Sequence, residues 1–143
     1  MKIAIINGPN LNLLGNRETN IYGTQSFETY FETLQAIFKD DELIYFQDNV
    51  EGNLVTAIQQ FGFNADAIVL NPAAYTHTSV AIGDAVAAVT ATVVEVHISN
   101  IFARESFRQI SHVSAKCAGV ISGLGLKGYE LAIHYIKSQA VPA

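Results

Sequence analysis

The chain has 143 residues, of which 8 are basic and 13 acidic, giving a formal net charge of −5. This length suits a single domain over 1–143, and a hydrophobic fraction of 50% excludes a disordered chain. The acidic balance argues against a nucleic-acid-binding protein, which needs a basic face. Only 15% of the residues are charged, against about 25% in an ordinary soluble domain. We therefore expect copies of the chain to cover part of its surface in a homo-oligomer.

The apolar segments do not match a targeting or membrane pattern. The first apolar run contains four residues and ends at Asn7, which is too short for a signal-peptide core. The longest apolar region, 79–96, is interrupted by Asp84 and two threonines and does not suit a spanning helix. The single cysteine, Cys117, cannot form an internal disulfide. We expect a cytoplasmic protein that binds no membrane.

Short apolar runs alternate with helical patterns along the chain. Runs that are apolar on both faces are typical of buried parallel strands, and they occupy 2–6, 43–46, 67–70, 93–96 and 118–121. The helical patterns cover 26–38, 53–61, 79–88, 103–111 and 127–138. Five such units predict an α/β fold with a doubly wound, five-stranded parallel sheet, for which the flavodoxin-like order 2-1-3-4-5 is simplest. Ligands of such sheets bind beyond the carboxyl ends of the strands.

The segment that follows the first strand, 7–23, is long and rich in asparagine. A polar turn explains an isolated asparagine, but a long loop at this end of a strand is more typical of a lid. The segment contains Arg17 and Tyr22, and a nearby guanidinium favours the phenolate form of a tyrosine. Tyr22 is therefore a candidate general base, with a tyrosine at a subunit interface as the alternative.

The segment after the third strand carries Asn71, His77 and several hydroxyl side chains, among them Thr76 and Ser79. Capping of the next helix accounts for the hydroxyl groups. It does not account for Asn71 or His77, which are candidates for ligand contact.

The fourth strand ends in Glu95 and His97, which are two residues apart and project to the same side. A carboxylate in this position can hold one ring nitrogen and leave the other for acid–base chemistry. Two polar residues in a buried strand are costly, which favours a function over a satisfied core pair. Ile98 and Ser99 then offer backbone N–H groups to an anion.

The helical pattern over 103–111 places Arg104 and Arg108 at i and i+4, on one face. Two arginines beside this loop suit a carboxylate clamp, and solvated surface arginines are the alternative.

Other motifs are incomplete. The G-x-G-x-x-G run at 123–128 lacks the acidic partner that a dinucleotide site needs about 20 residues later. The chain has no G-x-S-x-G elbow, H-E-x-x-H pair or cysteine cluster. Nothing in the spacing of the histidines and acidic residues requires a metal, so we expect neither metal nor cofactor.

Six ordered blocks resemble the type II 3-dehydroquinate dehydratases over nearly the whole chain: INGPNLNLLGNRE, IYG, NPAAYTHTSVAI, EVHISNI, ARESFR and SGLGLKGYELA. The resemblance implies a flavodoxin-like fold and dodecamers built from trimers. It implies a hydro-lyase of the shikimate pathway, which leads to the aromatic amino acids. Such an enzyme eliminates water from 3-dehydroquinate to give 3-dehydroshikimate without metal, nucleotide or lysine Schiff base.

The resemblance also assigns catalytic roles by position. Tyr22 matches the phenolate that removes a proton from the carbon beside the ketone, and Arg17 matches the lid arginine that keeps this phenol ionised. Asn10 matches the residue that holds the enolate through an ordered water. His97 matches the acid that protonates the departing hydroxyl, with Glu95 orienting it.

The remaining matches are to substrate-binding positions. Asp84 matches a residue that reaches in from a neighbouring subunit. The others match contacts within one subunit: Asn71 near the leaving hydroxyl, Ile98 and Ser99 at the carboxylate, and His77 and Arg108 at the ring hydroxyls.

The chain departs from the family pattern at four positions outside this set. It has Asp48 for serine, Val50 for histidine, Gly83 for arginine and Thr19 for proline. We expect these differences to affect the lid and the subunit contact.

Two other classes of protein compete with an enzyme. A flavodoxin-like module that binds phosphate or flavin needs a Ser/Thr/Gly-rich loop after the first strand, where this chain has asparagines, Arg17 and Tyr22. An inactive oligomeric scaffold has no need for an intact Tyr22, Arg17 and His97.

Overall fold

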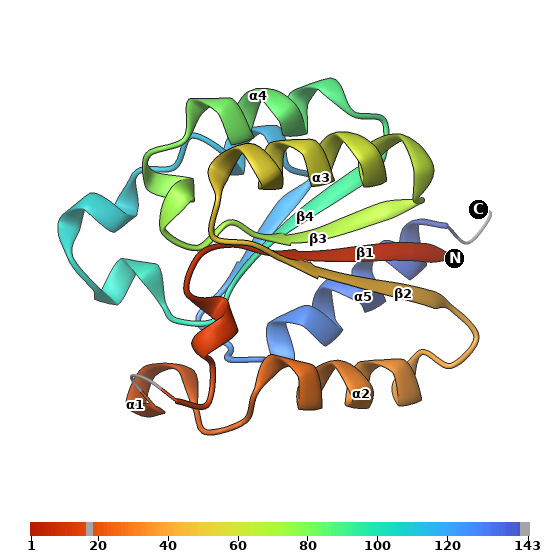
Figure 1. Cartoon of the computed structure of the whole chain (residues 1–143), viewed down its shortest axis with the longest axis horizontal. Coiled ribbons are helices and arrows are strands. Elements are labelled where there is room, and N and C mark those ends of the chain that lie inside the picture. Colours follow the sequence, from red (N-terminus) through yellow and green to blue (C-terminus); the bar gives the residue numbers. More distant parts are fainter. Residues whose placement is uncertain (17–18, 141–143) are drawn as a thin grey trace.

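The computed structural model describes residues 1–16 and 19–140, and it contains one all-parallel sheet in the order β2-β1-β3-β4-β5. This confirms the predicted flavodoxin-like order. Two helices cover each face (Figure 1). The strands are β1 (Lys2–Asn7), β2 (Glu42–Gln47), β3 (Ala67–Asn71), β4 (Thr92–His97) and β5 (Gly119–Ser122). The four longer helices are α2 (Phe27–Ile37), α3 (Glu51–Asn64), α4 (Val80–Ala88) and α5 (Lys127–Gln139).

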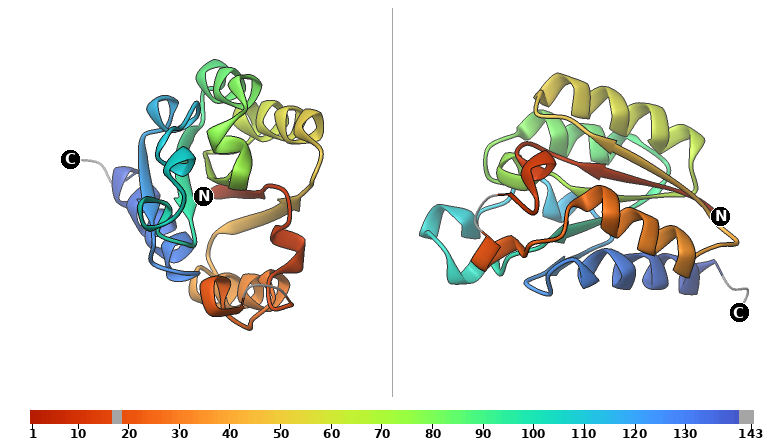
Figure 2. Two further views of the ribbon diagram at one scale, coloured as in Figure 1. Left: turned by 90° about the vertical axis from the view of Figure 1, so that its left-hand side faces the viewer. Right: turned by 60° about the horizontal axis from the view of Figure 1, so that its bottom comes forward.

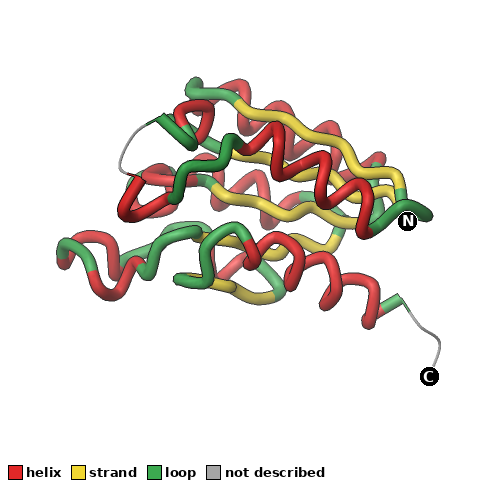
Figure 3. The backbone as a smooth tube through the Cα atoms, turned by 90° about the horizontal axis from the view of Figure 1, so that it is seen from below, coloured by secondary structure: helices red, strands yellow, loops and turns green. Residues whose placement is uncertain are grey.

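Side chains of β1, an inner strand of the sheet, alternate between two hydrophobic cores. Ile3 and Ile5 of β1 pack in the core under α2 and α5, which cover the lower face of the sheet (Figure 3). Ala4 and Ile6 belong to the second core, under α3 and α4. None of the four is exposed at all. Burial on both faces explains why the strand is an unbroken apolar run.

The carboxyl ends of the strands meet at the left-hand edge of Figure 1, and the left view of Figure 2 looks onto them. Short helical turns lie at this end: η1 (Leu11–Leu13), α1 (Thr19–Tyr22), η2 (Ala73–His77), η3 (Ile101–Ala103) and η4 (Ser106–Gln109). A further turn, η5 (Ser114–Lys116), precedes the amino end of β5 and contacts α4. The N–H of Gly8 donates to the carbonyl of Asn71 at 2.8 Å, and the Gln47 amide donates to the carbonyl of Gly8 at 3.1 Å. These bonds join the loops after β1, β2 and β3.

The predicted helix over 103–111 is wrong. The chain from β4 to β5 forms the 3-10 turns η3, η4 and η5, and the backbone of Arg104 is extended between the first two. Phe107 and Ile110 remain exposed, so the apolar face that stabilises a surface helix is missing. The four other predicted helices are present. Within the described residues, no helix has the length and apolar character that crossing a membrane requires.

Asp48, one of the departures from the family pattern, holds the beginning of α3. Its Oδ1 accepts the N–H of Val50 at 2.7 Å, and its Oδ2 accepts the Asn53 amide at 3.1 Å. The acidic side chain therefore satisfies donors in the first turn of a helix whose preceding residue, Val50, has no capping side chain.

Gly83, another departure, lies where α4 touches the loop before η5. A Cβ atom built on Gly83 would lie 2.2 Å from the carbonyl oxygen of His112. The N–H of His112 donates to the carbonyl of Thr76 at 2.8 Å, which fixes this loop between η2 and α4. An arginine at position 83 therefore requires a different path for the loop.

We predict that Gly83→Ala lowers the free energy of unfolding in urea by about 1–3 kcal/mol, because the overpacked contact outweighs the better helix propensity of alanine. Gly52→Ala is the control, since Gly52 is also helical and its Cβ meets nothing within 4 Å. The control should be as stable as the parent protein or more so. Equal gains in both variants would contradict the close contact at Gly83.

Candidate active site

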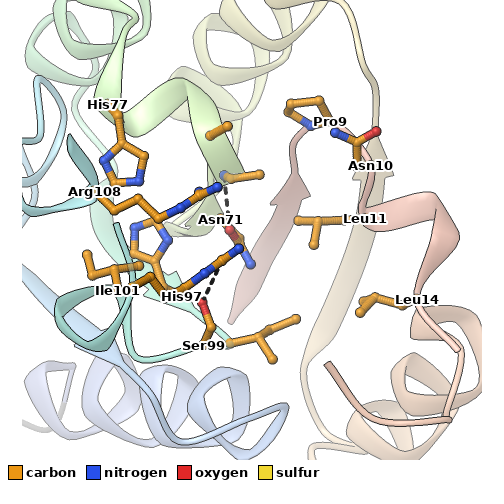
Figure 4. A pocket seen from close by; sticks show the side chains of 14 residues that line it. Pro9, Asn10, Leu11, Leu14, Asn71, His77, His97, Ser99, Ile101 and Arg108 are labelled. Carbon is orange, nitrogen blue, oxygen red and sulfur yellow. Dashed lines mark hydrogen bonds between the residues drawn. The ribbon is translucent and has the colours of Figure 1, made fainter. Parts of the chain in front are cut away.

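A pocket opens at the carboxyl ends of β1, β3 and β4, between η1, η2 and the turns that follow β4. Polar side chains gather along its wall (Figure 4). Its lining includes most of the residues expected from the sequence: Asn10, Asn71, His77, His97, Ile98, Ser99 and Arg108. Pro9, Leu11, Leu14, Ala73, Ala74, Ile101 and Arg104 complete it.

Glu95 and His97 form a buried pair at the end of β4. The Glu95 side chain is 0% exposed and His97 5%, and the His97 Nε2 lies 2.6 Å from a carboxylate oxygen of Glu95. Burial alone would raise the pKa of Glu95, but hydrogen bonds from His97, Ser114 and Thr76 outweigh it and hold the pKa below its usual value. Because Nε2 faces the carboxylate, Nδ1 is the ring nitrogen left for a ligand.

Besides His97, two hydroxyl groups donate hydrogen bonds to the Glu95 carboxylate. Thr76 donates to Oε1 at 2.6 Å and Ser114 donates to Oε2 at 2.5 Å. Helix capping was therefore the wrong interpretation of Thr76. It was correct for Ser79, whose hydroxyl accepts the N–H of Ile82 at 2.9 Å.

His77 lies beside His97, with ring centroids 6.4 Å apart and the rings 22° from parallel. Its Nδ1 lies 2.8 Å from the carbonyl of Ile110, which can only accept, so Nδ1 carries the proton and Nε2 remains an acceptor. Burial lowers the pKa of His77 below its usual value, and His97 and Arg108 add to this effect. His77 is therefore a neutral imidazole on the pocket wall.

Arg104 and Arg108 line the same pocket, although no helix joins them. Arg104 donates to the Ser99 hydroxyl at 3.2 Å, and Arg108 donates to Glu105 at 2.5 Å. Ser99, Arg104 and Ile21 also line a neighbouring hollow, which brings α1 alongside this part of the site. A hydroxyl and two guanidinium groups make this side of the pocket suitable for a carboxylate.

The Asn71 side chain, which is 2% exposed, is held from two directions. Its Oδ1 accepts the N–H of Ala73 at 3.1 Å, and its Nδ2 donates to the Tyr129 hydroxyl at 2.8 Å. Tyr129 in turn donates to Asn7 at 2.8 Å. The buried phenol of α5 thus orients an amide of the pocket wall from behind.

Asn10 occupies a left-handed conformation, with φ 70°, at the start of η1. Its N–H donates to Asn49 Oδ1 at 3.0 Å, and Asn49 also accepts from Gln47 at 3.2 Å. Asparagine tolerates this conformation better than most residues, and the loop after β2 supports it.

Four predicted site residues do not line this pocket, and one of them is Glu95, which is fully buried beside His97. Arg17 lies outside the described residues, and for Tyr22 the structure describes only the backbone position, at the end of α1. Asp84 is on the exposed side of α4 and does not line the pocket. Among residues 1–16 and 19–140, no three His, Cys, Asp or Glu side chains are grouped as metal ligands would be.

Sequence reasoning missed the residues that support the site from behind. Thr76, Ser114, Tyr129 and Asn49 make these supporting contacts across 19 to 122 positions of sequence. No local pattern signals such contacts. The sequence did indicate Arg104, because its spacing of four residues from Arg108 suits a carboxylate clamp.

The fold and the site define a class of protein. It is a flavodoxin-like α/β protein with an imidazole–carboxylate pair at the end of β4, whose imidazole lines a polar pocket. Comparison with known proteins narrows this class. Residues 1–137 match the family described as dehydroquinase class II, and the chain belongs to this family.

Individual relatives agree with this assignment. The 3-dehydroquinate dehydratase of Aliarcobacter butzleri is 52% identical over 135 residues, covering 93% of this chain and 82% of the relative. That of an Exiguobacterium species is 50% identical, covering 94% and 92%. The crystal structure of the type II dehydroquinase from Butyrivibrio crossotus aligns with a TM-score of 0.92 at 48% identity, over 96% of this chain and 97% of the other.

We predict that Tyr129→Phe lowers the free energy of unfolding by about 1–3 kcal/mol, because it leaves a buried oxygen of Asn7 without its donor. The loss is measured by urea denaturation. Tyr135→Phe is the control, since Tyr135 is an exposed tyrosine of the same helix. Equal stability of the two variants would contradict a structural role for the buried hydroxyl.

Proposed function

We propose that this chain is a hydro-lyase that removes water from 3-dehydroquinate to give 3-dehydroshikimate, in the shikimate pathway. The observation that carries the proposal is the buried Glu95–His97 pair, whose His97 lines a pocket with anion-binding groups on one side. Membership of the dehydroquinase class II family supports the same reaction. A flavodoxin-like binding module or an inactive scaffold would not need an acid held in this way.

The reaction begins with removal of a proton from the carbon beside the ketone. In the proposed mechanism the Tyr22 phenolate takes this proton, and Arg17 keeps the phenol ionised. The electrons of the C–H bond move into an enolate, which Asn10 stabilises. Ile21, the neighbour of Tyr22, lines a hollow with Ser99 and Arg104, which supports the placement of α1 beside the substrate.

The second step expels the hydroxyl group. The enolate electrons return to re-form the ketone, a carbon–carbon double bond forms, and the C–O bond breaks. His97 donates the proton that lets the hydroxyl leave as water. The proton gained by Tyr22 and the proton lost by His97 balance, so transfer through solvent restores both groups for the next turnover.

The remaining pocket residues bind the substrate in this proposal. Ile98 and Ser99 receive the carboxylate, with the neighbouring Arg104 adding a positive charge. His77 and Arg108 contact the ring hydroxyls, where a neutral His77 can accept a hydrogen bond. Asn71 contacts the substrate near the leaving hydroxyl.

We also propose a homododecamer built from trimers, working in the cytoplasm as a single-domain protein over 1–143. The small charged fraction supports extensive subunit contacts. Asp84 is exposed on α4, away from the pocket of its own chain, as expected of a residue that completes the site of a neighbour.

We predict that Tyr22→Phe and His97→Ala each reduce kcat by at least about 100-fold, because general acid–base groups contribute roughly 10²–10⁴-fold. Product formation is followed by the ultraviolet absorbance of the conjugated enone. Tyr135→Phe, far from the pocket, is the matched control and should keep the parent rate. Retention of more than a hundredth of the parent kcat by Tyr22→Phe would exclude Tyr22 as the base.

The same assay tests the reaction class. We expect the absorbance rise to survive both a chelator and borohydride, since the proposed chemistry uses only an acid and a base. Loss of activity on borohydride treatment would indicate a Schiff base instead, and loss with chelator would indicate a required metal.

We predict that two inactive variants complement each other across subunits. Asp84→Ala and His97→Ala proteins, unfolded together and refolded, should regain activity because some sites then combine an intact His97 with an intact Asp84. Each variant refolded alone should stay inactive. Absence of recovery in a mixture that sedimentation shows to be co-assembled would mean that each site lies within one chain.

A further inference from the structure

We propose that Ser111 and Ser114, acting with Thr76, are positioning residues that fix the direction of every hydrogen bond at Glu95 and thereby decide which nitrogen of His97 carries the proton. This inference rests on the proposed function of His97 as the acid. None of the three hydroxyl groups lines the pocket, so each would act through Glu95 and not on the substrate.

Two neighbouring hydroxyl groups each have one proton to give to the carboxylate. Thr76 has one hydroxyl proton, and it donates this proton to Glu95 Oε1 at 2.6 Å. Ser114 also has one, and the charged Oε2 at 2.5 Å is a nearer and stronger acceptor than the Ser111 oxygen at 2.9 Å. Both carboxylate oxygens therefore accept, which is the arrangement of an ionised carboxylate.

Ser111 determines the direction at Thr76. Its oxygen accepts the N–H groups of Val113 at 3.0 Å and Ser114 at 2.9 Å. Because these two N–H groups occupy the acceptor sites of the Ser111 oxygen, its hydroxyl proton is directed at the Thr76 oxygen, 2.7 Å away, and the Thr76 proton is directed at Glu95. The backbone N–H groups of Val113 and Ser114 thus orient the Ser111 hydroxyl, and Ser111 in turn orients the Thr76 hydroxyl.

These hydrogen-bond directions also determine how Glu95 interacts with the imidazole of His97. With both oxygens already accepting, the carboxylate has no proton to give, so the contact of 2.6 Å with His97 requires the ring Nε2 to donate. A neutral His97 then carries its only proton on Nε2 and has a bare Nδ1. Protonation of His97 places the reactive proton on Nδ1, the ring nitrogen that does not contact Glu95.

Other ionisable groups near the pair do not replace these hydroxyls. Among the described residues, those facing Glu95 and His97 are His77 from η2, Arg108 from η4 and Cys117 beyond η5. Burial, with a smaller effect of Glu95, raises the pKa of Cys117 to about 12, so this thiol is neutral. His77 donates to Ile110 instead.

The test compares three substitutions at position 114 in the intact enzyme. Ser114→Ala removes the donor, Ser114→Cys keeps the size with a poor donor, and Ser114→Thr keeps the hydroxyl. We expect the Ala and Cys variants to lose about 10- to 100-fold in kcat, the range for hydrogen bonds to charged groups. Their KM should change by no more than about twofold, because Ser114 does not touch the substrate. The Thr variant should recover most of the parent kcat.

The pH profile provides a readout that a merely structural role would not move. Loss of the Ser114 donor raises the pKa of Glu95, so on acidification kcat should begin to fall at a higher pH in the Ala and Cys variants than in the parent or the Thr variant. Ser138→Ala is the distant control, since its hydroxyl bonds only within its own helix, donating to the carbonyl of Tyr135 and accepting from the Gln139 amide. It should keep the parent profile.

The outcomes separate this inference from the proposed function. A parent enzyme that forms no conjugated product from 3-dehydroquinate would overturn the function itself. An active parent with an unchanged kcat and pH profile in Ser114→Cys would overturn the inference alone, as would a change in KM without one in kcat. If Ser114→Ala does not fold, the comparison of Cys with Thr decides.

Discussion

A buried carboxylate is the constraint around which the site is arranged. Glu95 is fully removed from solvent, and an ionised group in such a place is stable only when hydrogen-bond donors replace the lost water. Three donors do so, from η2, from η5 and from the imidazole on its own strand. Because each comes from a different segment, the charge also joins these segments. The hydrogen bonds that offset the cost of burying Glu95 are thus the same ones that hold η2, η5 and β4 together at the site.

The parallel sheet makes this convergence possible. Every strand ends at the same edge, so the loops after β1, β3 and β4 meet although they are far apart in sequence. Behind them the Tyr129 hydroxyl joins the ends of β1 and β3 through Asn7 and Asn71. The pocket wall is therefore supported by buried polar contacts on two sides, which is the support that a preorganised acid–base site needs.

The five parallel strands and four of the five predicted helices follow from the apolar runs and their spacing, and the sheet order is the simplest one for five such units. The Glu95–His97 pair follows as well, because alternation along a strand places both on one side. The predicted helix over 103–111 failed because its local pattern is helical while no core lies beneath Phe107 and Ile110. The hydroxyls around Glu95 could not be found in the same way, since helix capping explains such residues equally well. Sequence reasoning therefore finds the groups that project from strands and misses those that approach from distant turns.

The contact between Gly83 and the His112 carbonyl also limits how this chain can exchange residues with its relatives. The side chain at 83 and the path of the loop that carries Ser111 and Ser114 are mutually dependent. In this chain glycine is compatible with a loop close to α4, whereas a larger residue at 83 requires the loop to be displaced. A chimera that transfers only one of the two will disturb the hydroxyls behind the acid, whereas transfer of both together preserves them. The residue at position 83 and the segment 110–114 are therefore structurally coupled and should be exchanged together.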